Sequence, residues 1–236
     1  MRNILIKMIL LLLLPILNYA QGKPLKKKEM STSASTVPKQ IQFTQMWGWE
    51  YQNFDGEKGE MVAYYNPKSN YWLLTEETYG NTDGMCDWIL ATPNGQYYFA
   101  YKSAEFGSKN SLLKQNIKFP VNATMPDYFK PTGQKKDFGD PSYGFPKILG
   151  SAYSVKYEKT NDKTTLYIGN STANLTPIYH FNTLIADAKL PIFFPTDLPK
   201  GKIALAEHTI TSGRTVTFKL KYISHIDYHI DLSDYE

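Results

Sequence analysis

The stretch that decides the fold is IALAEHTITSGRTVTFKLKYISHIDYHIDL, residues 203–232. Two segments of alternating apolar and polar residues, 203–210 and 215–232, are joined by the short turn Thr211-Ser212-Gly213-Arg214. Along the second segment, large apolar side chains share one face of the predicted strand: Phe218, Leu220, Tyr222, Ile226, Tyr228, Ile230 and Leu232. A period of two is typical of a β-strand. An alternation of this length predicts a broad, strongly curved antiparallel sheet with one wet face.

The same period begins again at residue 41 and predicts a meander of five antiparallel strands. The predicted strands cover residues 41–51, 60–65, 71–78, 85–92 and 96–102, and the first of them places Ile41, Phe43, Trp47, Trp49 and Tyr51 on one face. Short connections such as Asn66-Pro67-Lys68-Ser69-Asn70 and Pro93-Asn94-Gly95 have the composition of turns. Connections this short join neighbouring antiparallel strands.

Two later regions complete the predicted domain. Residues 103–147 are rich in Pro, Gly, Lys and Asp, and we expect a long loop in which 111–119 forms a short helix or a strand. A hairpin follows, with strands at 153–159 and 163–169. Residues 177–190 carry apolar residues at helical spacing and end at a proline, so they predict one helix on the concave side of the sheet.

The N-terminus has the organisation of a secretory signal peptide. Arg2 and Lys7 precede an apolar run that is too short for a stable membrane anchor, and we expect cleavage after Ala20. Residues 21–40 are polar and Lys-rich and predict a flexible tether, which leaves 41–236 as one β-rich domain. These features predict an exported protein, periplasmic or secreted, with no transmembrane segment in the mature chain.

Composition excludes several classes of protein. The chain of 236 residues has a net charge of +4, and its excess of lysine lies in the signal peptide and the tether. Arg214 is the only arginine after Ala20, which argues against nucleic-acid binding because phosphate and base recognition depends heavily on arginine. Cys86 is the only cysteine, so no intrachain disulfide can form, and we expect it to be a small buried apolar residue.

The order of these signals resembles a known type of fold. The hairpin MVAYYNPKSNYWLL (61–74), the segment KILGSAYSVKYE (147–158) and the ending IDLSDYE (230–236) are similar to an uncharacterised family of exported bacterial proteins. That family resembles the lipoprotein-carrier-like (LolA/LolB-like) half-barrels, in which a curved antiparallel sheet is closed by helix on its concave side. The resemblance implies this fold, and it implies function only weakly because carriers of this type bind acyl chains while many relatives have no established role.

The aromatic residues of the first meander suggest a binding groove. In runs such as Tyr64-Tyr65 and Tyr97-Tyr98-Phe99 both faces of a strand are aromatic, although a sheet with one buried face needs only one. Our candidates for an apolar groove that binds a lipid or lipidated protein are Trp47, Trp49, Tyr64, Trp72, Tyr98 and Phe181. Two alternatives remain open: the second face packs beneath the 103–147 loop, or the rings stack on sugars.

Signatures of catalysis are mostly absent. The sequence has no H-E-x-x-H, G-x-S-x-G, C-x-x-C or phosphate-binding glycine loop, and no cofactor is implied. His225, Asp227 and His229 alternate along the last strand and have the chemistry of metal ligands, but they equally suit a solvent-facing edge of that strand. The candidates for a metal site therefore stay weak, and no catalytic residue is assigned.

Three functions follow from the sequence. The first is a non-enzymatic envelope protein that binds an apolar ligand, a lipid or an acyl chain, on its concave face. The second is a protein-interaction module with a solid core, and the third is a hydrolase with an unrecognised site. A filled concave face favours the second of these, an apolar cavity the first, and a polar cleft gathering Asp, Glu and His the third.

Overall fold

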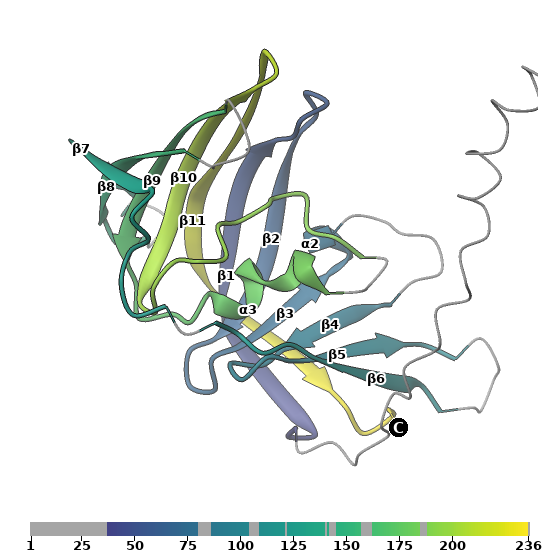
Figure 1. Ribbon diagram of the computed structural model, residues 1–236. Helices are drawn as coiled ribbons and strands as arrows, with labels where there is room; N and C mark the ends of the chain where they lie inside the picture. The colour runs from purple at the N-terminus through teal and green to yellow at the C-terminus, as the bar shows by residue number, and fades with distance from the viewer. Residues whose placement is uncertain are drawn as a thin grey trace, which may run out of the picture. The chain divides into compact units, whose positions relative to one another are not determined.

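The described part of the chain folds around one large antiparallel sheet (Figure 1). The computed structural model describes residues 37–79, 86–103, 109–120, 122–139, 141, 145–156, 162–184 and 188–235. The predicted signal peptide and the tether up to residue 36 lie outside the described residues. The strands are β1 (Gln40–Gln52), β2 (Lys58–Asn66), β3 (Tyr71–Thr75), β4 (Trp88–Ala91), β5 (Gln96–Tyr101), β6 (Ser111–Asn116), β7 (Phe129–Phe138), β8 (Ile148–Val155), β9 (Lys163–Asn170), β10 (Lys202–Thr211) and β11 (Arg214–Asp231). The short helices are α2 (Glu76–Tyr79), α3 (Thr176–Tyr179) and the 3-10 turn η2 (Phe181–Thr183).

The eleven strands are arranged in the order β6-β5-β4-β3-β2-β1-β11-β10-β9-β8-β7, and every pair of neighbours is antiparallel. The first and last strands therefore pair at the centre. We call β2–β6 the N-terminal wing and β7–β10 the C-terminal wing. The sheet is curved and does not close, so the predicted mainly β, half-barrel-like architecture is confirmed. The five-strand meander is also confirmed, except that its third strand ends at Thr75 and continues as α2.

The prediction of a long loop over 103–147 is wrong at β7, whereas β6 confirms the strand that was one of two possibilities for 111–119; these two strands are the edges of the sheet. Proline misled the prediction at β7. Pro131 is tolerated because an edge strand leaves one row of N–H groups unpaired. A register shift between Pro131 and Lys135, with Gly133 at φ +81, bends the strand. Lysines along the exposed edge also discourage pairing with another chain.

The helix predicted over 177–190 is confirmed only at its start. Among the described residues of this range, α3 and η2 are helical and residues 188–190 are not. Asn182 gives the physical reason, because its side chain replaces a helical hydrogen-bond ladder. Its Nδ2 donates to the carbonyls of Leu190 (3.2 Å) and Ile192 (3.0 Å), and its Oδ1 accepts from the Leu190 N–H (2.7 Å). Apolar residues at helical spacing are buried here by an irregular strap, residues 188–194, that follows the short helices.

The hairpin expected at 153–159 and 163–169 begins earlier in the chain. Its first strand, β8, runs from Ile148 to Val155, and residues 157–161 lie outside the described part. The final hairpin is confirmed, with Ser212 (φ 49) and Gly213 (φ 77) in the left-handed conformation that a tight two-residue turn requires.

The prediction that β11 keeps one apolar face is wrong. The register shift against β1 between Gly48 and Trp49 places one extra residue of β11 between Leu220 and Tyr222, and this exchanges the faces of the strand. Phe218 and Leu220 consequently pack on one side of the sheet, whereas Ile226 and Ile230 pack on the other. A bulge adds one residue to one strand, so the alternation that follows it has the opposite phase.

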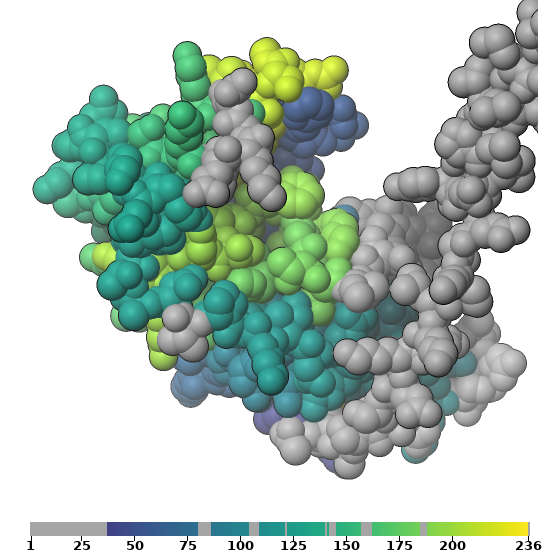
Figure 2. Space-filling model, in the orientation of Figure 1, coloured from purple at the N-terminus to yellow at the C-terminus, as the bar shows by residue number. Residues whose placement is uncertain are grey.

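The concave side holds the larger apolar cluster. Side chains from both wings converge there on Ile178, Phe181 and Phe194 of α3, η2 and the strap. In Figure 2 this green segment fills the space in front of the central strands. Among the largest fully buried side chains are Trp49, Trp72 and Tyr97.

A second cluster covers the outer face of the N-terminal wing. β2 pairs with β1 only from Gln45 onward, so residues 40–43 of β1 and the end of β11 continue as a two-stranded ribbon (Figure 1). This ribbon packs Ile41, Phe43 and Ile230 against the outer residues of the wing: Tyr64, Leu73, Leu90 and Tyr98. The backbone N–H of Asn110 donates to the Asp234 carbonyl (3.1 Å), which ties the end of the chain to the start of β6. The ribbon, rather than a 103–147 loop, therefore accounts for the aromatic residues on both faces.

Within the described residues, no helix combines the length and the hydropathy that a membrane crossing requires.

Candidate functional site

The six candidates for an apolar groove are all buried, and they do not line one groove. Trp47, Trp49, Trp72 and Phe181 belong to the concave cluster, whereas Tyr64 and Tyr98 belong to the outer cluster. None of the six is more than 7% exposed. The Trp47 and Trp72 rings meet edge to face at 5.4 Å, and the Trp72 indole N–H donates to the Asn174 carbonyl (2.7 Å). These side chains act as core in the described structure.

The weak metal candidates are brought together only in part. His229 Nε2 lies 2.7 Å from Asp227 Oδ1, and Gln42 Nε2 donates to the same oxygen at 2.8 Å. These two hydrogen bonds lower the pKa of the Asp227 carboxyl, the bond from Gln42 contributing most. His225 lines a cavity described below. In the described part of the chain, no group of three His, Cys, Asp or Glu side chains is placed to hold a metal ion.

Cys86 is buried, as the sequence predicts. The Tyr79 hydroxyl donates to the Cys86 carbonyl (2.7 Å), and the Cys86 Sγ lies 3.7 Å from that hydroxyl oxygen. Burial raises the pKa of the thiol above its ordinary value, which opposes formation of a nucleophilic thiolate. This geometry favours a structural role for Cys86.

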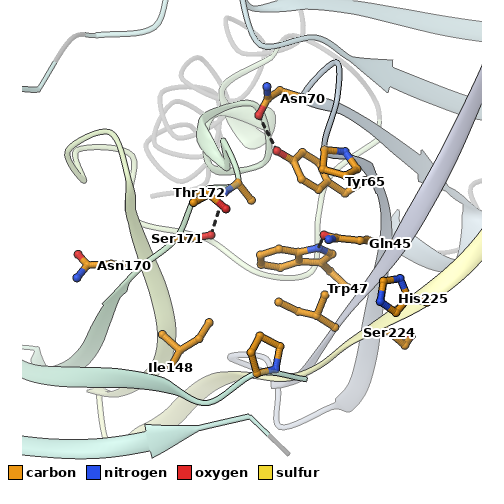
Figure 3. A pocket seen from close by; sticks show the side chains of 14 residues that line it. Gln45, Trp47, Tyr65, Asn70, Ile148, Asn170, Ser171, Thr172, Ser224 and His225 are labelled. Atoms are coloured by element: carbon orange, nitrogen blue, oxygen red, sulfur yellow. Dashed lines mark hydrogen bonds between the residues drawn. The ribbon is translucent and has the colours of Figure 1, made fainter. Parts of the chain in front are cut away.

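The most informative cavity lies on the concave side, beside the central strands, and has a volume of about 670 Å³ (Figure 3). It is formed by β1, the turn between β2 and β3, the middle of β11, the start of β8 and the segment that follows β9. Its described lining comprises Gln45, Trp47, Tyr65, Pro67, Asn70, Pro146, Ile148, Asn170, Ser171, Thr172, Ala173, Ile223, Ser224 and His225. The lining thus combines amide and hydroxyl groups with two aromatic residues, Trp47 and Tyr65.

Local turn chemistry positions one side of the cavity. Asn66 Oδ1 accepts hydrogen bonds from the N–H groups of Lys68 (2.8 Å) and Ser69 (3.1 Å), which closes the β2–β3 turn. Asn70 then adopts φ 59, a left-handed conformation that asparagine tolerates better than most residues. This conformation places Asn70 Oδ1 where the Tyr65 hydroxyl donates to it at 2.6 Å.

Several lining groups are held in place by hydrogen bonds. Trp47 Nε1 donates to Gln45 Oε1 (3.1 Å), and Lys202 Nζ donates to Asn170 Oδ1 (2.8 Å). Burial raises the pKa of the Tyr65 phenol, and its one O–H proton is held in the hydrogen bond to Asn70. The cavity therefore presents a largely preorganised set of donors and acceptors.

Ser224 differs from these groups. Its Oγ is a buried atom, and no hydrogen-bond partner for it exists among the described residues. An unpaired buried hydroxyl costs free energy. The cross-strand partner of Ser224 is Met46, which packs with the outer cluster, so the Ser224 side chain lies on the outer face of the sheet and its Oγ does not face the cavity.

The cavity is electrically neutral at its described lining. No Asp, Glu, Lys or Arg is among the described lining residues, and His225 is the one histidine among them. A hydrolase that uses two carboxylates requires a convergent pair within about 10 Å. The described lining supplies no such pair.

Sequence reasoning missed most of this cavity. The turn at residues 66–70 is predicted, but its role in a cavity is not, and Gln45 and Ser224 carry no motif. His225 attracts attention only as a metal candidate. The available signal was the interruption of alternation near Gln45 and His225, which are cross-strand partners beside a register shift and both line the cavity.

A scan against protein-family models finds no match for this chain, and a search of curated proteins finds none either.

Proposed function

We propose that this protein is a non-enzymatic, exported binding protein that holds a neutral, polyhydroxylated ligand in the cavity lined by Gln45, Asn70 and Asn170. The ligand class is a saccharide, either free or as the headgroup of a glycolipid. The observation that carries the proposal is the cavity lining, which combines neutral amides and hydroxyls with aromatic rings. Sugars present hydroxyls to such amides, while Trp47 and Tyr65, each 2% exposed, form the packed floor beneath the ligand.

This proposal keeps the binding class expected from the sequence and changes the ligand. An acyl chain in a groove of the six candidate aromatics would have to displace packed core, since those side chains are buried. A glycolipid headgroup retains the lipid partner that the resemblance to lipoprotein carriers suggests. Export is part of the proposal and rests on the N-terminal residues 1–20.

The test is calorimetric titration of the mature chain, starting at residue 21, with maltotriose, chitotriose and palmitate, followed by binding to vesicles that contain a neutral glycosyl diacylglycerol. We expect saturable binding of at least one saccharide. Binding of the glycolipid vesicle without the free sugars identifies a headgroup. Binding of palmitate alone would overturn the saccharide proposal in favour of an apolar ligand.

Two substitutions locate the ligand in the cavity. Gln45→Leu should weaken saccharide binding about tenfold, because it removes a neutral amide from the cavity lining. Thr172→Trp should abolish binding, because Thr172 is an exposed lining residue and an indole there fills the space. Thr124→Trp, at an exposed position outside the cavity, is the matched control and should bind normally.

The second candidate is a protein-interaction module, and the filled concave cluster favours it. If neither the saccharides nor palmitate bind the mature chain, we would assign the protein to this class. The outer faces and edges of the sheet would then be the surfaces to test.

A further inference from the structure

A second cavity, separate from the saccharide site proposed above, lies on the concave side near the β1–β2 hairpin. Its volume is about 360 Å³, and it shares no described lining residue with the first cavity. The strap supplies Ile192 and Phe193, the hairpin supplies Phe54, and β11 supplies Phe218. Phe193 is 74% exposed and Phe54 is 46% exposed, so apolar rings flank the space without being packed into the core.

One carboxyl group faces this apolar space. Glu207 of β10 lies opposite Phe218 on β11 and opposite Leu166 on β9, and cross-strand partners project to the same face. Phe218 and Leu166 both belong to the concave cluster, so the Glu207 side chain points inward as well. A glutamate at an inward position between two buried apolar residues requires an explanation.

The protein gives Glu207 little compensation for this position. Thr209 Oγ1 donates to Glu207 Oε1 at 2.7 Å. Within the described part of the chain, no basic residue lines the cavity or forms an ion pair with Glu207. Burial accordingly raises the pKa of the carboxyl above its ordinary value, with the Thr209 hydrogen bond opposing the shift.

Arg214 of the neighbouring hairpin is engaged with other groups. It lies over the Phe54 ring, 4.6 Å from its centroid, and Arg214 Nη1 lies 3.5 Å from Asp55 Oδ1. The Phe54 ring therefore already accepts a cation on its face. Asp55 also lines the cavity and is paired with Arg214, which leaves Glu207 as the lining carboxyl that has no cationic partner among the described residues.

We propose that Glu207 and the surrounding phenylalanines form a binding site for a small organic cation, an amine that carries an apolar group. The ammonium pairs with the Glu207 carboxylate, while the apolar group packs against Phe193 and Phe218. Aromatic rings attract cations through their negative faces, and a carboxylate in a partly desolvated cavity strengthens that preference. The site is independent of the saccharide proposal, so either one can fail alone.

The experiment compares three ligands of similar shape and different charge: 2-phenylethylamine, 2-phenylethanol and 3-phenylpropanoate. Binding to the mature chain is followed by NMR titration of the backbone amides of β10, β11 and the strap. We expect the amine to bind at least tenfold more tightly than the alcohol, and the propanoate to bind most weakly. Equal affinity for amine and alcohol, or no binding of the amine, would overturn the proposal.

Variants separate the charge from the apolar contact. Glu207→Gln should remove the preference for amine over alcohol while the thermal unfolding midpoint stays the same or rises, because the variant no longer buries a carboxyl. Phe193→Ala should weaken amine and alcohol alike. Glu50→Gln, at a half-exposed carboxyl outside the cavity, is the control and should behave as the parent chain. An unchanged amine preference in folded Glu207→Gln would contradict the assignment.

Discussion

The two wings of the sheet share one concave cluster but differ on their outer faces. In the N-terminal wing the outer residues Tyr64, Leu73, Leu90 and Tyr98 are at most 7% exposed, because the β1–β11 ribbon crosses over them. In the C-terminal wing the outer residues Leu149 and Ile210 are 55% and 42% exposed. The N-terminal wing therefore has an apolar core on each of its two faces, whereas the C-terminal wing has one on its concave face. The difference is due to the ribbon, which covers the outer face of the N-terminal wing.

The largest expected effect tests the ribbon directly. Phe43→Ala removes a fully buried ring from the outer cluster and should lower the free energy of unfolding by about 3–5 kcal/mol. Ile210→Ala, on the outer face of the other wing, should cost less than about 1 kcal/mol. Urea denaturation of both variants gives the comparison. Similar losses for the two would mean that the wings do not differ as described.

A smaller loss of unfolding free energy is expected for a change in the strap, which packs on the concave side of both wings. Asn182→Ala removes three hydrogen bonds that hold the strap to the short helices and should cost about 2 kcal/mol. Hydrogen exchange should rise first in the strap and then in the concave residues of both wings. Faster exchange confined to one wing would show that the strap stabilises that wing alone.

Gly48 lies on β1, a strand between the two wings. It is opposite Tyr222, at the register shift where the two faces of β11 are exchanged. A Cβ at this position would meet the Tyr222 ring at 2.3 Å. Gly48→Ala should therefore cost about 1–2 kcal/mol through overpacking. The double variant Gly48→Ala, Tyr222→Ala should recover part of this loss relative to the sum of the single variants. Strict additivity in denaturation measurements would contradict a direct steric conflict.

The smallest effects concern the pH dependence of unfolding stability. Glu60 in the N-terminal wing and Glu207 in the C-terminal wing should contribute to it with opposite sign. The Tyr222 hydroxyl donates to Glu60 Oε1 (2.6 Å) and Lys221 Nζ donates to Oε2 (2.9 Å), and the folded protein lowers the pKa of Glu60 from 4.5 mainly through the Tyr222 bond. The stability that Glu60 contributes is present above its unfolded pKa and is lost as pH falls through the lowered value. Burial raises the pKa of Glu207 from 4.5, so its contribution is full below 4.5 and is lost as pH rises through the raised value.

Two variants separate these contributions. Glu207→Gln should flatten the decline of stability on the alkaline side of pH 4.5, and Glu60→Gln should flatten the decline on the acid side. Chemical denaturation between pH 3 and 8 measures both. A parallel shift of the whole curve in either variant, with no change of slope, would argue against titration of that carboxyl.

The strands and the ribbon of β1 and β11 show which features a sequence can predict and which it cannot. Alternation along 41–51 and 215–232 predicts strands because a strand must bury every second side chain, and that local requirement is written in the chain. Consecutive aromatics such as Tyr97-Tyr98-Phe99 indicate two buried faces. They do not say that a ribbon of β1 and β11 covers the second one, since that contact joins residues about 130 positions apart in sequence.

By itself, the sequence determined the β class, the curved antiparallel sheet, the five-strand meander and the final hairpin, because each depends on local periodicity and turn chemistry. Tertiary structure alone decided the rest. Pro131 is compatible with a strand only because β7 is an edge, and Asn182 stops a helix only because the strap returns to it. Gln45 and Glu207 face the concave side because bulges and cross-strand partners set their direction. These are long-range geometric facts, and periodicity within one segment does not record them.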